Sequence, residues 1–261
     1  MHKRFYRCFY WSIPGWFPLV DYELMEIVGD FQESASIKGH ILELGCYKGK
    51  SSILLGKLLG QSEELILVDL FEEIGASSVM DTPLYKGLTQ KTLERNLKLF
   101  QVEATILKID SGNIAESTET RAFRLIHIDA GHTYEPASKD LDSALHIMQE
   151  AGVIILDDYR NINFPGMWVA FAEFVSNREV SVLFATETKA YLVKTEHLNT
   201  YKPLLDSIKL LRQFRVLSST GDPFVTLEFK FIRRFIQKLY SAAGLVSIRL
   251  SNLLNKIRLK E

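Results

Sequence analysis

The chain has 261 residues, of which 47% are hydrophobic and 24% are charged, and this composition is ordinary for a globular protein with a sizeable core. No apolar run reaches the roughly 18 residues that a membrane span requires, and Pro14, Gly15 and Pro18 interrupt the N-terminal stretch, so we predict neither a transmembrane helix nor a signal peptide. Cys8 and Cys46 lie far apart, which argues against a disulfide framework and favours a cytoplasmic protein.

Charge is distributed unevenly along the chain. The formal net charge is −1, but residues 222–261 hold eight Lys/Arg and three Asp/Glu, so the body is acidic and the C-terminal segment is basic. An acidic body argues against binding to the phosphate backbone of a nucleic acid.

Aromatic side chains are concentrated in residues 1–20, and Leu24, Ile27, Val28 and Phe31 then recur at helical spacing. We therefore predict an aromatic arm and an amphipathic helix over residues 1–35. Such an arm could cap a binding pocket or pack against the body, and the sequence favours packing.

Apolar runs alternate with helical stretches from residue 40 onward. This alternation is typical of βαβ units in a mostly parallel sheet. Two further runs, 180–186 and 190–195, flank Glu187-Thr188-Lys189 and indicate an antiparallel edge hairpin. We predict a doubly wound α/β fold with a seven-stranded, Rossmann-like sheet and extra N- and C-terminal helices. The other predicted strands cover residues 41–44, 65–68, 105–109, 125–128 and 153–156, and the predicted helices cover 50–60, 84–100, 134–150, 166–177 and 198–213.

The C-terminal part has helix signals of its own, because Asp222-Pro223 is typical of a helix start and basic amphipathic segments follow. We divide the chain into the arm and helix over 1–35, a core over 36–195 and a helical extension over 196–261. The basic segment 222–261 either packs on the body or across a homodimer, or lies peripherally on an anionic membrane surface. The sequence favours packing.

A glycine turn between a strand and a helix is the main binding motif. Gly45 and Gly49 follow the strand 41–44, and the next helix directs unpaired N–H groups above the turn. Tyr47 stands where a dinucleotide fingerprint has glycine, so a cofactor with a carboxylate fits better than a pyrophosphate. Asp69 ends the second strand, the position at which an acidic side chain meets the ribose hydroxyls of an adenosine cofactor. Asp110-Ser111 end the third strand and could contact the adenine ring of such a cofactor.

Carboxylates also end the next two strands. Asp129 follows one strand and Asp157-Asp158 end the other, and three such groups would repel one another unless a cation lay between them. Carboxylate oxygens suit Mg²⁺ or Mn²⁺ better than zinc. His132 lies three residues past Asp129, where it can accept a proton near neutral pH, whereas His127 lies inside an apolar strand and is interpreted as structural.

Residues 40–195 resemble the class I S-adenosylmethionine-dependent methyltransferases, and Leu42–Ser51 is similar to the cofactor loop of catechol O-methyltransferase and the macrocin-type sugar O-methyltransferases. Asp158 stands where the catechol enzyme has Asn, and His132 stands where it has a catalytic Lys. The resemblance implies that Asp129, Asp157 and Asp158 bind the metal, that Asp69 binds the ribose and that Asp110 and Ser111 bind the adenine. It further implies that the methionine part is surrounded by Glu43, Gly45, Tyr47, Gly49 and Ser51.

The predicted activity is metal-assisted methyl transfer to a hydroxyl of a small molecule or sugar, with His132 and Asp129 as catalytic residues. Three alternatives stay open. They are a nicotinamide-dependent oxidoreductase, an RNA methyltransferase and a cofactor-binding scaffold without activity.

Overall fold

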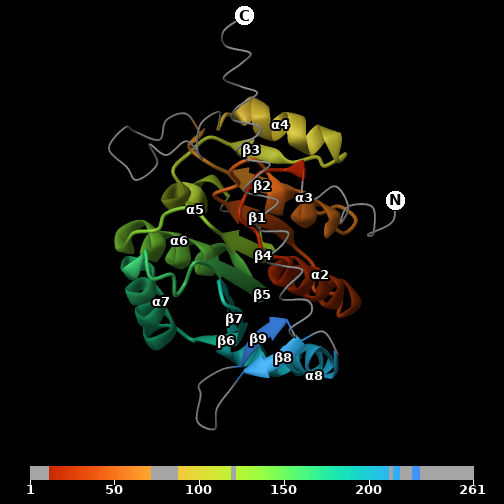
Figure 1. Cartoon of the computed structure of the whole chain (residues 1–261), viewed down its shortest axis with the longest axis vertical. Helices are drawn as coiled ribbons and strands as arrows, with labels where there is room; N and C mark the ends of the chain where they lie inside the picture. Colours follow the sequence, from red (N-terminus) through yellow and green to blue (C-terminus); the bar gives the residue numbers. More distant parts are fainter. Residues whose placement is uncertain (1–11, 72–87, 119–121, 212–213, 218–224, 230–261) are drawn as a thin grey trace, which may run out of the picture.

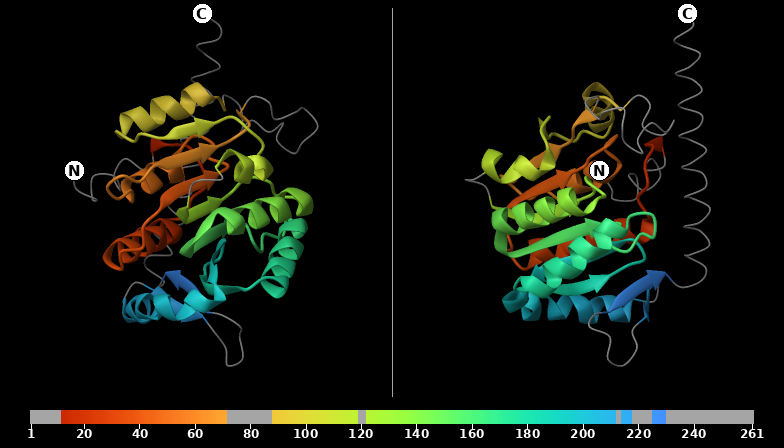
Figure 2. Two further views of the ribbon diagram at one scale, coloured as in Figure 1. Left: turned by 180° about the vertical axis from the view of Figure 1, so that it is seen from behind. Right: turned by 90° about the vertical axis from the view of Figure 1, so that its left-hand side faces the viewer.

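The computed structural model describes residues 12–71, 88–118, 122–211, 214–217 and 225–229, and these form one sheet with helices on both faces (Figures 1 and 2). The helices are α2 (Leu19–Ser34), α3 (Lys50–Lys57), α4 (Gln90–Leu99), α5 (Ile114–Ser117), α6 (Tyr134–Ile147), α7 (Pro165–Asn177) and α8 (Lys202–Leu210), with 3-10 turns η3 (Ser111–Asn113) and η4 (Thr195–Tyr201). The strands are β1 (His40–Leu44), β2 (Leu65–Val68), β3 (Thr105–Leu107), β4 (Phe123–Ile128), β5 (Met148–Asp157), β6 (Val180–Ala185), β7 (Lys189–Lys194), β8 (Phe214–Leu217) and β9 (Thr226–Phe229).

Strand order places the carboxyl ends of five parallel strands side by side. Within the described residues the order is β3-β2-β1-β4-β5-β7-β6-β9-β8. The first five strands are parallel, and β7 is antiparallel to both β5 and β6. The doubly wound, mostly parallel sheet with its antiparallel hairpin is therefore confirmed. The chain reverses strand order beside β1, and that is where open α/β sheets bind ligands.

Two apolar layers stabilise the sheet, one on each face. Alternate residues of β1 and β2 point to opposite faces, so Ile41 and Leu65 pack with α2, α3, α4 and α8, whereas Leu42 and Ile66 pack with α5, α6 and α7. Figure 2 shows the sheet between these two helical layers. Burial on both faces explains why the central strands are continuous apolar runs.

The predicted C-terminal helical extension is partly wrong. Helix α8 follows η4 as expected, but β8 and β9 come next, and β9 occupies residues where a helix beginning at Asp222-Pro223 was predicted. Local capping signals favoured a helix, but pairing of Thr226 with Ala185 of β6, together with burial of Leu227, favours a strand. The sheet therefore continues past the predicted seven strands. The basic segment after Phe229 lies outside the described residues.

A buried arginine joins α2 to the amino end of β4. Arg124 is 1% exposed and donates hydrogen bonds to Glu63, to Gln32 Oε1 at 2.7 Å and to the Leu58 carbonyl at 2.6 Å. This network lies at the edge of the sheet opposite the loops that carry the predicted site. No helix among the described residues is both long enough and apolar enough to cross a membrane.

Candidate active site

The glycine loop is held tightly against the end of β4. Gly45 has φ +82°, and a Cβ added there would lie 2.0 Å from the Asp129 carbonyl oxygen, so only glycine fits. The Gly45 N–H donates to the Val68 carbonyl at 2.9 Å, and the Asp129 N–H donates to the Leu44 carbonyl at 2.8 Å. The cofactor loop and the Asp129 loop are therefore in direct backbone contact.

Tyr47 and Gly49 complete the turn, both in the left-handed region, with φ of 47° and 85°. Asp69 fixes this turn, because its Oδ2 accepts from the Tyr47 N–H at 2.8 Å and its Oδ1 accepts from the Phe71 N–H at 3.0 Å. Burial raises the pKa of Asp69, and the two backbone hydrogen bonds oppose that rise. Ser51 lies in the first turn of α3 and is half-buried.

Glu43 lies beneath this loop and is fully buried. Its carboxylate accepts a hydrogen bond from Ser52, and its Oε1 lies 2.9 Å from His127 Nδ1. Contact between Glu43 and a cofactor stays a prediction, but the described contacts give this residue a supporting role under the turn.

The predicted adenine residues form the next loop. Asp110 is exposed and its Oδ1 accepts from the Gly112 N–H at 2.9 Å, which caps η3. Ser111 lies beside Asp140 of α6, and burial raises the pKa of Asp140 to about 6, with Ser111 and the Gly131 N–H opposing the rise. Asp140 thus lies between the loop that carries Ser111 and the loop that carries His132.

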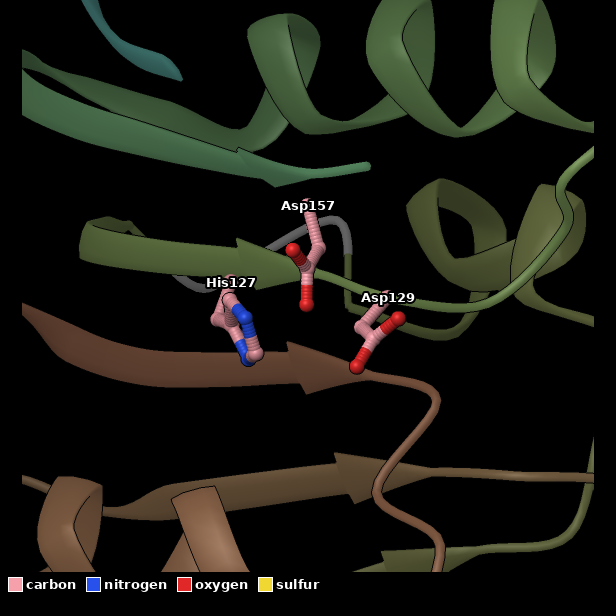
Figure 3. A group of neighbouring side chains, drawn as sticks. All are labelled: His127, Asp129 and Asp157. Carbon is pink, nitrogen blue, oxygen red and sulfur yellow. The ribbon is translucent and has the colours of Figure 1, made fainter. Parts of the chain in front are cut away.

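Three side chains gather where β4 and β5 end. One possible ligand atom each of His127, Asp129 and Asp157 lies within 4.8 Å of the other two (Figure 3). His127 is 1% exposed, and its Nε2 has no hydrogen-bond partner among the described residues. His127 was interpreted as structural, and its contact with Glu43 supports such a role. Its position beside the carboxylates was not predicted.

His132 lies between two carboxylates on the open side of this cluster. Its Nε2 is 3.2 Å from Asp158 Oδ2 and 3.6 Å from Asp129 Oδ1, and its Nδ1 lies 3.0 Å from the Ala130 carbonyl. The Phe164 ring packs against the imidazole, with ring centres 4.4 Å apart. The structure therefore brings together His132, Asp129 and Asp158 as the sequence predicted.

The two carboxylates beside His132 differ in proton affinity. Loss of solvation and the charge of Asp157 raise the pKa of Asp129 well above its usual value. Burial alone would raise the pKa of Asp158, but hydrogen bonds from His132 and Asn161 hold it below its usual value. Environments that separate two neighbouring carboxyl groups in this way are typical of acid–base sites.

Lys189 is the residue that sequence reasoning missed. It is 0% exposed, contacts the Asp157 carboxylate and faces Asp157 in the register of β5 and β7. Burial alone would lower the pKa of Lys189, but Asp157, Asp129 and Asp21 outweigh that effect and raise it. The sequence placed Lys189 in the hairpin turn, and only the strand order β5-β7 shows that this turn returns to the end of β5.

The segment before α2 covers part of the site. The Trp16 ring lies 5.8 Å from the Tyr47 ring, Phe17 lies 6.1 Å from His127, and Lys50 Nζ donates to the Gly15 carbonyl at 3.0 Å. The described part of the aromatic arm therefore packs on the body, as favoured from the sequence, and it does so directly beside the cofactor loop.

Residues 42–159 match the family model described as a methyltransferase domain. This stretch is a methyltransferase domain. The protein is therefore an S-adenosylmethionine-dependent methyltransferase, and the predicted resemblance to the class I enzymes is confirmed. The nicotinamide-dependent oxidoreductase and the inactive scaffold are set aside.

Solved structures agree with this fold. The O-methyltransferase NovP is 14% identical, with a TM-score of 0.50 over 67% of this chain and 80% of its own. A Staphylococcus aureus protein assigned as a caffeoyl-CoA O-methyltransferase is also 14% identical, with a TM-score of 0.50 over 74% of this chain and 90% of its own. No curated protein matches the sequence of this methyltransferase. At this identity the two structures support the methyltransferase's fold alone.

Proposed function

We propose that this methyltransferase methylates a hydroxyl group of a small molecule or sugar. The observation that carries the proposal is the placement of His132 Nε2, within 3.6 Å of two carboxylates at the carboxyl edge of the sheet. A neutral imidazole that donates its Nδ1–H to the Ala130 carbonyl keeps an Nε2 lone pair for the proton of an acceptor hydroxyl, and the hydrogen bond from Nε2 to the ionised Asp158 belongs to the imidazolium that then forms. An alcohol is a poor nucleophile without such a base.

The methyl donor supplies an electrophilic methyl group on a sulfonium. Gly45, Tyr47, Gly49 and Ser51 would surround its methionine part, Asp69 its ribose, and Asp110-Ser111 its adenine. The left-handed turns of the loop support this placement, and helix α3 begins directly after Gly49, where a helix N-terminus directs backbone N–H groups toward a ligand. The donor would supply its methyl carbon to the acceptor oxygen as the carbon–sulfur bond breaks, and His132 Nε2 would accept the hydroxyl proton.

A metal was predicted from Asp129, Asp157 and Asp158, with Mg²⁺ or Mn²⁺ as the ion. The carboxylate oxygens suit such an ion, but the described structure already places the Lys189 ammonium on Asp157. The three-carboxylate set therefore fits a divalent ion poorly, and no step above involves one.

Other predictions about surroundings stay predictions. A cytoplasmic location, a homodimer and a membrane contact through residues 222–261 all depend on parts of the chain or on partners outside the described residues. The acidic body continues to favour a small acceptor over RNA.

Isothermal titration of the full chain with S-adenosylmethionine and, separately, with NAD tests the cofactor assignment. We expect saturable binding of the methyl donor alone. Asp69→Ala should weaken donor binding by about tenfold or more, where tenfold corresponds to about 1.4 kcal/mol, whereas the matched control Asp206→Ala, at an exposed side chain of α8, should not. Binding of NAD in place of the methyl donor would overturn the proposal.

A further inference from the structure

Strand topology places a buried ammonium group among the site carboxylates. Lys189 is the first residue of β7, and β7 runs antiparallel to β5, so Lys189 lies opposite Asp157, the last residue of β5. Its side chain is fully buried and its Nζ contacts Asp157 Oδ2. A buried lysine is costly unless anions surround it, and breaking such a pair leaves an uncompensated charge.

The surroundings of Lys189 are built for a cation. The Phe17 ring centre lies 5.2 Å from Nζ, an arrangement that attracts positive charge to the face of the ring. Asp21 is also fully buried and its charge acts on Lys189, and the hydroxyls of Thr186 and Thr188 donate to the Asp21 carboxylate at 2.9 and 2.8 Å. Lys189 therefore has an anion and an aromatic face that belong to no predicted metal shell.

This arrangement disfavours the binding of a second cation. Asp157 already has a partner, and the Asp157 Oδ1 accepts the Asp158 N–H at 2.8 Å. An ion placed among His127, Asp129 and Asp157 would lie near a fixed ammonium that has no room to withdraw, because its side chain is fully buried. Repulsion between like charges at such separations costs several kcal/mol in a protein interior.

We infer that Lys189 is the resident cation of the carboxylate cluster and takes the place that a divalent metal would hold. Lys189 is a positioning residue: it holds Asp157 and offsets the charge of Asp129, while Asp129 and Asp158 remain beside His132. The consequence for turnover, methyl transfer without a divalent ion, rests on the function proposed above. The replacement of a metal ion by Lys189 does not depend on that function.

The test uses Mn²⁺ as the probe, because its binding is read from the loss of the free-ion electron paramagnetic resonance signal and needs no acceptor. The full chain is treated with EDTA, freed of chelator and titrated. We expect no saturable Mn²⁺ binding at micromolar concentrations. One equivalent of bound Mn²⁺ that Asp157→Asn removes would overturn the inference.

Two variants sharpen the result. Lys189→Met removes the ammonium and should create Mn²⁺ binding at least about tenfold tighter than in the wild type, since one opposing charge beside the ion is lost. Lys209→Met, on α8 and paired with exposed Asp206, should leave Mn²⁺ binding unchanged. A folded Lys189→Met protein that gains no Mn²⁺ binding would contradict the inference.

The Mn²⁺ titration of the wild type tests the role of Lys189 even if the Lys189→Met variant does not fold. Donor binding, measured in parallel, keeps the two proposals separate. Loss of S-adenosylmethionine binding would refute the proposed function, and saturable Mn²⁺ binding that Asp157→Asn removes would refute the role of Lys189.

Discussion

Replacement of Gly45 by alanine tests the contact between the glycine loop after β1 and the Asp129 loop after β4. Gly45 has φ +82°, and the new Cβ would lie 2.0 Å from the Asp129 carbonyl oxygen and 2.5 Å from its carbon. Both are backbone atoms, which cannot rotate away as a side chain would. The substitution must therefore separate the end of β1 from the end of β4.

The expected cost has two parts. An alanine in the left-handed region costs about 1–2 kcal/mol, and forcing extra volume into a packed site costs about 1–3 kcal/mol more. The free energy of unfolding should fall by roughly 2–5 kcal/mol, which is roughly 4–20 °C in Tm for a chain of this size at about 2–4 °C per kcal/mol. Affinity for the methyl donor should fall as well, because the turn moves.

Thermal unfolding followed by circular dichroism gives the change in Tm, and isothermal titration with S-adenosylmethionine gives the change in donor affinity. Gly60→Ala is the control, since the nearest atoms to its Cβ belong to the Glu63 side chain at 3.2 Å. A Gly45→Ala protein that unfolds at the wild-type temperature and binds the donor equally well would refute the close approach.

Three further substitutions have distinct expected results. The pKa of Asp140 is raised from 3.8 to about 6, so its contribution to stability is complete below about pH 4 and is lost as pH rises through 6. Urea unfolding should therefore show the wild type losing about 3 kcal/mol relative to Asp140→Asn between about pH 4 and 7.5, and a constant difference would contradict the burial argument. Arg124→Met leaves Glu63 without its buried partner and should cost about 3–5 kcal/mol in unfolding free energy with donor affinity retained; a parallel loss of affinity would show that the two edges of the sheet are coupled. Asp69→Asn loses one acceptor for the loop N–H groups and should weaken donor binding about tenfold by titration, and unchanged affinity would remove Asp69 from the donor site.

Much of the fold follows from local sequence pattern. The apolar run 65–68 coincides with β2. Gly45 and Asp129, at which two other apolar runs end, directly follow the last residues of β1 and β4. Burial on both faces makes such strands uniformly apolar, so their ends are visible as the first polar or glycine residue. The convergence of Asp129, His132 and Asp158 was predictable because parallel strands bring their carboxyl ends to one edge.

Two features depended on long-range pairing. Local sequence signals predict that Lys189 lies in a turn. Its burial beside Asp157 requires β7 to return antiparallel beside β5. Similarly, Asp222-Pro223 favours a helix locally, whereas pairing of β9 with β6 and β8 makes Thr226–Phe229 a strand. Local sequence patterns do not reveal such long-range strand pairing. The repulsion among the carboxylates therefore suggested a metal ion, whereas the structure places a lysine beside them.

The role of His132 in methyl transfer to a hydroxyl is tested by following labelled methyl from S-adenosylmethionine to a panel of hydroxyl acceptors, with wild type compared with His132→Ala. We predict that the label is bound to an acceptor oxygen and that turnover falls by about 10²–10⁴-fold in His132→Ala, the usual contribution of a positioned base, with donor affinity unchanged. Equal turnover in the variant, or label found on nitrogen or sulfur of the acceptor, would contradict the account.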